Sequence, residues 1–233
     1  MKTAFITGGT KGIGYGVAES LLSEGYAVAF TGRTAQGVQE AEAALSRAFA
    51  GRVLGLTADV RDLASMEKAV AATVEKFGGV DVVIANAGIG ILKDISELTA
   101  EDWNETIETN LTGVFYTVKA TLDEVIRRKG YVITIASLAG ANFFEKGTAY
   151  NASKFGLVGF SQALMLDVRD KDVKVTTIMP GSVATYFNNH VPSEADAWKI
   201  QPEDIGQMVA DLLKMNPRTL PSKVEVRPAK TRK

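Results

Sequence analysis

A tyrosine and a lysine stand four positions apart in the run Tyr-Asn-Ala-Ser-Lys, as Tyr150 and Lys154. On a helix, positions i and i+4 share a face, so the lysine ammonium is expected beside the tyrosine phenol. A neighbouring cation favours the phenolate and lowers the phenol pKa from its ordinary value near ~10. The pair therefore predicts a group that exchanges protons near neutral pH, as carbonyl reduction requires. An exposed Tyr/Lys pair on a solvated helix is the alternative.

A glycine-rich turn, Thr-Gly-Gly-Thr-Lys-Gly-Ile-Gly, lies far upstream at 7–14, after a strand-like run and before a helical one. Glycine permits a tight turn and close approach to a pyrophosphate, and the helix dipole attracts the anion. The spacing is GxxxGxG rather than GxGxxG, and a purely structural turn is the alternative. The candidate nucleotide-binding residues of the turn are Gly8, Thr10, Lys11, Gly12, Ile13 and Gly14.

The end of the second predicted strand indicates which nucleotide the turn would bind. Arg33 follows this strand, about 20 residues after the glycines, where dinucleotide folds that prefer NAD carry an acid on the ribose 2′-hydroxyl. An arginine there is suited to the 2′-phosphate of NADP(H), and Lys11 could add a second positive charge. The alternative is that both are solvated cations. We expect NADP(H) as the cofactor.

Composition excludes several other kinds of chemistry. The 233 residues carry 26 basic and 27 acidic side chains, so a net charge of −1 offers no general attraction to nucleic acid or to a membrane. There is no cysteine and one histidine, His190, which excludes thiolate catalysis and a multi-histidine metal site. No apolar run approaches membrane-spanning length, and the chain begins directly with a strand-like run. We expect a cytoplasmic protein without a metal.

Short apolar runs alternate with longer helical patterns along the chain, and no linker divides it. The expected strands are 3–7, 27–31, 53–57, 80–85, 131–136, 173–179 and 224–227; the expected helices are 12–24, 35–49, 62–77, 101–128, 149–169 and 202–214. Such alternation predicts βαβ units, with helices on both faces of one parallel sheet. The prediction is a single α/β domain over 1–233, a Rossmann-type doubly wound sheet of about seven strands.

The least regular stretch, 181–200, carries aromatic residues and follows the end of a strand. Ligands of open α/β sheets bind at that edge, so we expect a substrate lid; an ordinary surface connection is the alternative. His190 is expected to be a plain loop residue. Apolar residues after the fourth and fifth strands suggest the mouth of a pocket or parts of the core. They are Ile89, Gly90, Ile91, Leu92, Leu138, Ala141, Phe143 and Phe144.

Taken together, these features resemble the short-chain dehydrogenase/reductase family over nearly the whole chain. The motifs that carry the resemblance occur in order: the turn at 7–14, Asp59-Val60, Asn86-Ala87-Gly88, Asn110, Ser137, Tyr150 with Lys154, and Pro180-Gly181. Two departures stand out. Ala85 occupies the place of an asparagine, and the chain end lacks the Gly-Gly typical of 3-oxoacyl-carrier-protein reductases.

The resemblance implies a role for each of these residues. Ser137 would orient and polarise a substrate carbonyl, and Tyr150 would donate the proton. Lys154 would bind the nicotinamide ribose and lower the pKa of Tyr150, while Asn110 would hold a water on the proton path. For the cofactor, Asp59 would meet the adenine amino group and Val60 the adenine ring. The remaining implied cofactor contacts are Asn86, Ala87 and Gly88 along the groove, and Pro180, Val183 and Thr185 at the nicotinamide end.

The expected function is that of an NADPH-dependent oxidoreductase that reduces a small ketone or aldehyde to an alcohol, reversibly. Two alternatives stay open: a 3-oxoacyl-carrier-protein reductase, and a non-catalytic NADPH-binding or scaffold protein. The helices expected at 101–128 and 149–169 carry apolar residues in several directions, more than one core-facing stripe needs. We therefore expect a homodimer or homotetramer through these helices, although scattered apolar residues are also normal on monomers.

Overall fold

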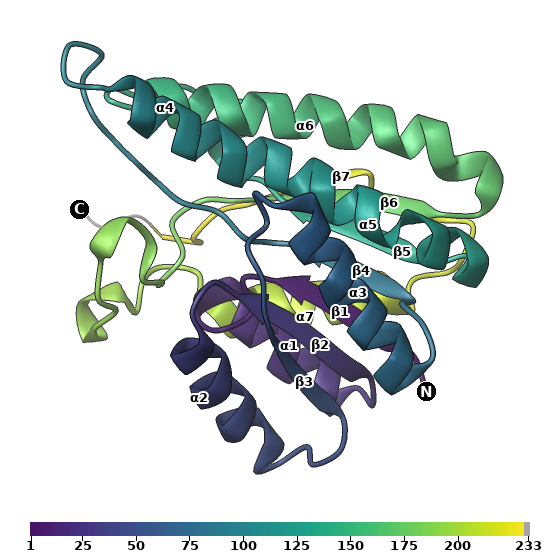
Figure 1. The fold of residues 1–233 in the computed structure, drawn as a ribbon. Helices are drawn as coiled ribbons and strands as arrows, with labels where there is room; N and C mark the ends of the chain where they lie inside the picture. The colour runs from purple at the N-terminus through teal and green to yellow at the C-terminus, as the bar shows by residue number, and fades with distance from the viewer. Residues whose placement is uncertain (231–233) are drawn as a thin grey trace.

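The computed structural model of the protein describes residues 1–230 and builds them around one seven-stranded sheet (Figure 1). The strand order is β3-β2-β1-β4-β5-β6-β7, and every neighbouring pair is parallel. The strands are β1 (Thr3–Thr7), β2 (Ala27–Gly32), β3 (Val53–Thr57), β4 (Val82–Ala85), β5 (Tyr131–Ile135), β6 (Lys174–Pro180) and β7 (Lys223–Val226). The prediction of a doubly wound parallel sheet of about seven strands is confirmed.

Helices cover both faces of this sheet (Figure 1). One face carries α1 (Gly12–Ser23), α2 (Ala35–Ser46) and α7 (Pro202–Lys214), and the other carries α3 (Leu63–Phe77), α4 (Ala100–Ile107), α5 (Gly113–Arg128) and α6 (Thr148–Val168). Each face has its own apolar core, and all five residues of β1 are buried between the two. Strands covered on both faces read as continuous apolar runs, which is why the sequence located them well.

The chain changes direction across the sheet between β1 and β4, because β2 and β3 lie on one side of β1 and the later strands lie on the other. In an open parallel sheet, a crevice forms at such a point beyond the carboxyl ends of the strands. All strands are parallel, so their carboxyl ends lie at that edge. The loops after β1, β2, β4, β5 and β6 begin there. The fold thus brings distant parts of the sequence to one crevice.

Capping residues set several of the helix starts. The Asp62 side chain accepts a hydrogen bond from Ala64 N–H at 2.9 Å at the start of α3. Thr99 and Asp102 form a capping box at the start of α4, and Pro202 is the first residue of α7. Each of these caps satisfies backbone donors that the first helical turn leaves without a partner.

The single helix expected at 101–128 is wrong in one respect. A π-helical segment, Glu108–Thr112, separates α4 from α5. The sequence contains no proline at this place, and Gly113 follows the segment and does not interrupt it. Segments of this type are rare and often lie at functional sites, and this one carries Asn110.

Candidate active site

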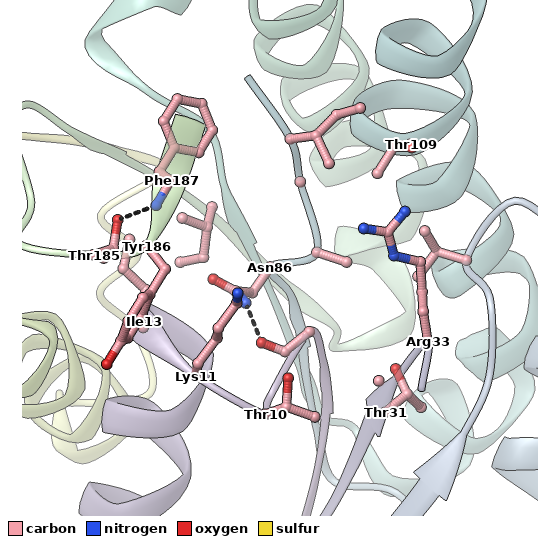
Figure 2. A pocket seen from close by; sticks show the side chains of 18 of the residues that line it. Thr10, Lys11, Ile13, Thr31, Arg33, Asn86, Thr109, Thr185, Tyr186 and Phe187 are labelled. Atoms are coloured by element: carbon pink, nitrogen blue, oxygen red, sulfur yellow. Dashed lines mark hydrogen bonds between the residues drawn. The ribbon is translucent and has the colours of Figure 1, made fainter. Parts of the chain in front are cut away.

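A cavity of about 270 Å³ lies along the carboxyl edge of β1, β2 and β4 (Figure 2). Most residues predicted to contact a nucleotide line it: Gly8, Thr10, Lys11, Gly12, Ile13, Arg33, Val60, Asn86, Ala87, Gly88, Tyr150, Lys154 and Thr185. Arg33 and Thr109 lie toward one end of this cavity, and Tyr186 and Phe187 lie toward the other (Figure 2). We call it the nucleotide cavity.

The glycine-rich turn forms the floor of the nucleotide cavity. Gly8 and Gly12 have φ values of +68° and +59°, in the left-handed region where other residues are strained. Gly14 lines no cavity; a Cβ there would lie 2.3 Å from Gly8 O, so this glycine lets the helix pack closely on the turn. At the start of α1, Lys11 gives no side-chain cap. The first amides of α1 can therefore serve an anion.

Asn86 joins the turn to the loop that follows β4. Its Nδ2 donates to Thr7 O and to Gly8 O, both at 3.0 Å, and its backbone N–H donates to Thr7 Oγ1 at 3.0 Å. These bonds connect two loops 79 residues apart in the chain. Asn86 thus holds the shape of the cavity floor while also lining it.

Arg33 lies past the end of β2, at the end of the nucleotide cavity (Figure 2). Its Nη1 lies 3.8 Å from Oε1 of Glu105 in α4, and both side chains are about half exposed. Lys11 Nζ lies 5.2 Å from the centre of the Tyr186 ring. Both cations line the cavity, and no acidic side chain does so among the described residues.

The structure does not place Asp59 in the lining of the nucleotide cavity, although its neighbours Ala58 and Val60 are there. Arg61 Nη2 donates to Asp59 Oδ2 at 2.7 Å, and Arg61 Nε donates to Asp59 Oδ1 at 3.1 Å. Hydrogen bonding from Arg61 holds the pKa of the Asp59 carboxyl below its usual value, although burial opposes this. The Asp59 carboxylate is thus already paired with Arg61, two residues further along the chain.

Thr109 is a lining residue that the sequence did not indicate. Its hydroxyl is buried, and it alone among the buried side-chain polar atoms of the described residues has no hydrogen-bond partner. A buried group without a partner is costly, which points to a partner supplied by a ligand. Left-handed glycines, uncapped helix amides, two cations and this hydroxyl together fit a phosphorylated dinucleotide.

Tyr150 and Lys154 lie on α6, where both line the nucleotide cavity. Lys154 Nζ lies 5.7 Å from the centre of the Tyr150 ring and donates to Ile135 O at 3.1 Å. Lys154 is only 5% exposed, and burial lowers its pKa to about 8. The helical spacing has brought the two groups to one face, as expected.

The pKa of Tyr150 is shifted upward in this structure, and Lys154, which the resemblance implied would lower it, is not among the groups that shift it. Burial raises the pKa of Tyr150, and the side chain of Ser137 opposes this rise. Removing a phenol from water disfavours its charged form. The phenol is therefore held in its protonated form at neutral pH.

Asn110 lines neither cavity and is fully buried. Its Oδ1 accepts from Ile89 N–H at 2.8 Å, and its Nδ2 donates to Ile89 O at 2.9 Å. Its Nδ2 also donates to Ser153 Oγ at 3.1 Å. The Asn110 side chain therefore links the loop after β4 to α6, and both of these elements carry residues that line the nucleotide cavity.

A second cavity, of about 350 Å³, adjoins the first at Tyr150 and is here called the substrate cavity. Its lining includes Ser137, Pro180 and Val183, three residues predicted for the site, and also Phe144, Phe187, His190 and Lys199. The residues that line both cavities are Ile13, Ala136, Tyr150, Thr185 and Phe187. Tyr150 therefore lines both the nucleotide cavity and the substrate cavity.

The segment 181–200 closes on itself at its base. Val183 and Ile200 form a parallel bridge, in which Ala184 N–H donates to Ile200 O at 2.9 Å and Ile200 N–H donates to Ser182 O at 3.1 Å. Two short helical turns, η4 (Phe187–Asn189) and η5 (Glu194–Asp196), lie between these ends. The segment is therefore more ordered than a plain surface connection.

Asp196 organises the charges within this segment. Its Oδ1 lies 2.6 Å from Lys199 Nζ, and its Oδ2 lies 2.6 Å from His190 Nε2 and accepts from Ser193 N–H at 3.0 Å. These bonds hold the pKa of the Asp196 carboxyl far below its usual value. His190, expected to be a plain loop residue, lines the substrate cavity as part of this network.

Two absences concern the described residues alone. No group of three or more histidine, aspartate or glutamate side chains within 1–230 is arranged to hold a metal ion. No helix in the same range has the length and apolar character needed to cross a membrane.

Comparison with known proteins places this arrangement in a family. The sequence profile of the short chain dehydrogenases matches residues 2–196. An oxidoreductase of Staphylococcus saprophyticus is 31% identical over 228 residues, covering 97% of each chain. The 3-oxoacyl-(acyl-carrier-protein) reductase of Escherichia coli is 35% identical over 185 residues, which cover 79% of this chain and 74% of that one.

The fold comparison agrees with the sequences. The solved structure of an alcohol dehydrogenase from the archaeon Thermococcus sibiricus, complexed with 5-hydroxy-NADP, matches with a TM-score of 0.93. The two chains are 32% identical, and the match covers 100% of this chain and 99% of the other. This chain belongs to the short-chain dehydrogenase/reductase family of oxidoreductases, which use a nicotinamide cofactor.

Proposed function

We propose that the protein is an NADPH-dependent carbonyl reductase, which converts a ketone or aldehyde to an alcohol in a reversible reaction. One observation carries the proposal. Tyr150 lines both a cavity suited to a dinucleotide and a second cavity, and Ser137 also lines the second one. A proton donor at the junction of two such spaces is what carbonyl reduction needs.

Each side chain has a role in this proposal. When bound, the nicotinamide supplies the hydride, and the protein supplies orientation and the proton. The hydroxyls of Ser137 and Tyr150 hydrogen-bond to the carbonyl oxygen, and Tyr150 gives its proton to that oxygen as negative charge develops there. Lys154 holds the ribose next to Tyr150. Asn110 positions the loop after β4 through Ile89, and it would also hold the water on the proton path that the family resemblance implies.

NADPH is the proposed cofactor because of the charges at the end of β2. Arg33 and Lys11 line the nucleotide cavity, and no carboxylate lines it among the residues described. A guanidinium matches a phosphate in both charge and geometry. The complex of the Thermococcus sibiricus relative with 5-hydroxy-NADP supports the same preference.

Reduction of a 3-oxoacyl group on a carrier protein is a second candidate. The likeness to the Escherichia coli reductase favours it, and the missing Gly-Gly at the chain end counts against it. A non-catalytic NADPH-binding protein is the remaining alternative. It has no use for a proton donor with a buried lysine beside it, so the pair Tyr150 and Lys154 disfavours it.

The segment 181–200 is the proposed substrate lid, because its residues line the substrate cavity and its base is fixed by the Val183–Ile200 bridge. Closing such a segment over a substrate excludes water from the reaction.

An assay of cofactor oxidation tests the proposal. The purified protein is mixed with NADPH or NADH and with a panel of ketones, aldehydes and 3-oxoacyl thioesters, and absorbance at the nicotinamide band is followed. We expect turnover of simple carbonyl compounds with NADPH above that with NADH. Turnover of thioesters alone would favour the second candidate. Cofactor binding without turnover of any carbonyl compound would favour the non-catalytic protein.

A further inference from the structure

Two phenylalanine rings accompany the proposed proton donor. The ring centres of Phe187 and Tyr150 lie 5.4 Å apart with a 60° tilt, and those of Phe144 and Tyr150 lie 6.3 Å apart with a 54° tilt. Both phenylalanines line the substrate cavity and stay partly exposed. Large apolar rings held open to solvent at a cavity indicate a binding surface more than a core.

Each ring rests on a glycine. A Cβ on Gly90 would lie 2.1 Å from Phe187 Cζ, and a Cβ on Gly147 would lie 2.8 Å from Phe144 Cε2. No side chain larger than hydrogen fits under either ring without displacing it. The two rings are therefore seated on backbone, one from the loop after β4 and the other at the start of α6.

Phe143 provides a contrast within the same loop. Its ring stacks on Phe155 of α6, with centres 5.9 Å apart and planes 9° apart, and it is 84% exposed. It lines neither cavity, so the sequence expectation that it belongs to the pocket mouth is wrong. Of two adjacent phenylalanines, only Phe144 turns toward Tyr150.

The charged groups of the substrate cavity are already engaged with each other. His190 and Lys199 both line it, and each bonds to a different oxygen of Asp196. This cluster carries no uncompensated charge when His190 is neutral. A charged substrate group would have to compete with Asp196 for its partner.

We propose that the substrate is a neutral compound whose carbonyl is attached to a flat, conjugated group, such as an aromatic ring. The inference rests on the proposed function and deepens it. A flat group beside the carbonyl can pack against Phe144 and Phe187 while the carbonyl oxygen reaches Tyr150 and Ser137. Aromatic pairs gain roughly two- to tenfold beyond the burial of their area, which a saturated group of the same skeleton does not gain.

The test compares phenyl methyl ketone with cyclohexyl methyl ketone, which share a carbon skeleton. For each protein, kcat/KM with the phenyl compound is divided by kcat/KM with the cyclohexyl compound. Comparing this ratio between variants and the wild type cancels the different reactivities of the two ketones. We expect Phe187→Leu and Phe144→Leu each to lower the ratio by about two- to tenfold.

Two further variants sharpen the result. Phe143→Leu is the matched control, an identical change at the adjacent ring outside the cavity, and it should leave the ratio within about twofold. Gly90→Ala keeps Phe187 but displaces its ring, so it should lower the ratio as Phe187→Leu does. Binding of 2′,5′-ADP shows that each variant is folded, because Arg33 and Lys11, the two cations proposed to hold the phosphates, are unchanged in all of them.

The outcomes separate this inference from the proposed function. An unchanged ratio in Phe187→Leu, Phe144→Leu and Gly90→Ala, with turnover retained, overturns the flat-substrate inference and leaves carbonyl reduction standing. An equal fall in Phe143→Leu also overturns it, because the effect would not come from the cavity. No turnover of either ketone by the wild type rejects the inference, and no turnover across the whole carbonyl panel rejects the proposed function as well.

Discussion

Glu105 of α4 places its carboxylate 3.8 Å from the guanidinium of Arg33, at the end of the nucleotide cavity. The pair joins the end of β2 to a helix on the other side of the crevice. Glu105 orients the arginine and also offsets part of its charge. A bound 2′-phosphate would share Arg33 with this carboxylate.

Changes at this pair should alter cofactor choice in opposite directions. Arg33→Asp replaces attraction by repulsion, so the ratio of kcat/KM for NADPH to that for NADH should fall by roughly ten- to a hundredfold. Glu105→Gln should raise NADPH affinity about twofold to fivefold, the range expected of an exposed ion pair. Glu101→Gln on the same helix is the control and should do neither. Equal ratios in wild type and Arg33→Asp would make Arg33 a plain surface cation, provided that Lys11→Ala in the same background also changes nothing.

Removing the Tyr150 hydroxyl should separate binding from turnover. Tyr150→Phe keeps the ring, so cofactor affinity should stay the same while kcat falls by about 10²- to 10⁴-fold. Because burial raises the pKa of Tyr150, the wild-type reduction rate should fall only on the alkaline side of neutral pH. Tyr116→Phe, outside both cavities, should keep full turnover. Near-normal turnover of Tyr150→Phe would remove the tyrosine from the mechanism.

The buried ammonium of Lys154 should make stability depend on pH. Its pKa is about 8 in the folded protein against 10.5 ordinarily, so between these values the unfolded chain binds more protons. The free energy of unfolding should therefore rise with pH across this window. Lys154→Met removes the effect and should be more stable than wild type at pH 7 by roughly 1–3 kcal/mol, a lead that shrinks by pH 10. Urea unfolding at both pH values measures it, and a constant difference would contradict the buried, proton-losing lysine.

Thr109→Val should raise the stability of the cofactor-free protein and lower its affinity for the cofactor. The variant removes a buried hydroxyl that has no partner, so thermal unfolding should show a gain of about 1 kcal/mol. The dissociation constant of 2′,5′-ADP should rise about three- to tenfold, since a ligand bond is lost. Thr106→Val is the control, because the Thr106 hydroxyl already donates to Asp102 O at 2.8 Å, and it should not change nucleotide affinity. A Thr109→Val protein with unchanged nucleotide affinity would show that the hydroxyl meets no ligand.

Helices α5 and α6 should form a contact between subunits. They expose Phe115, Phe155 and Leu166 by 45%, 40% and 54%, and Phe115 packs edge-on against Phe160. We expect light scattering at micromolar concentration to give two or four times the 24.9 kDa chain mass. Phe155→Glu should lower the mass toward one chain, whereas Ile95→Glu, at an exposed residue outside both helices, should not. A wild-type mass near 24.9 kDa would exclude a stable assembly.

The sheet could be predicted because its strands are apolar on both faces and its turns carry local signals. Expected strand bounds differ from the observed ones by only one or two residues at most ends, as with β4, which begins at Val82. The π-helical segment could not be predicted, because the sequence at 108–112 is compatible with an ordinary helix. Its effect is to turn Asn110 inward, toward Ile89 and Ser153.

Within the site, the residue types were predictable and several of their relationships were not. The Asp59–Arg61 pair depends on a side-chain geometry that spacing alone does not give. The direction of the Tyr150 pKa shift depends on how deeply the phenol is buried, which only the folded chain determines. The orphan hydroxyl of Thr109 is likewise a property of the space around it.

The bridge between Val183 and Ile200 holds the two ends of the intervening segment together. The chain between Val183 and Ile200 starts and ends at two backbone positions that lie side by side. Its length and sequence can therefore vary while β6 and α7 keep their positions. We expect an exchange of residues 184–199 for the corresponding stretch of a relative to change substrate preference while Phe144 and the rest of the substrate cavity stay the same. We expect such an exchange to leave the sheet unchanged, because the bridge fixes both ends of the exchanged stretch.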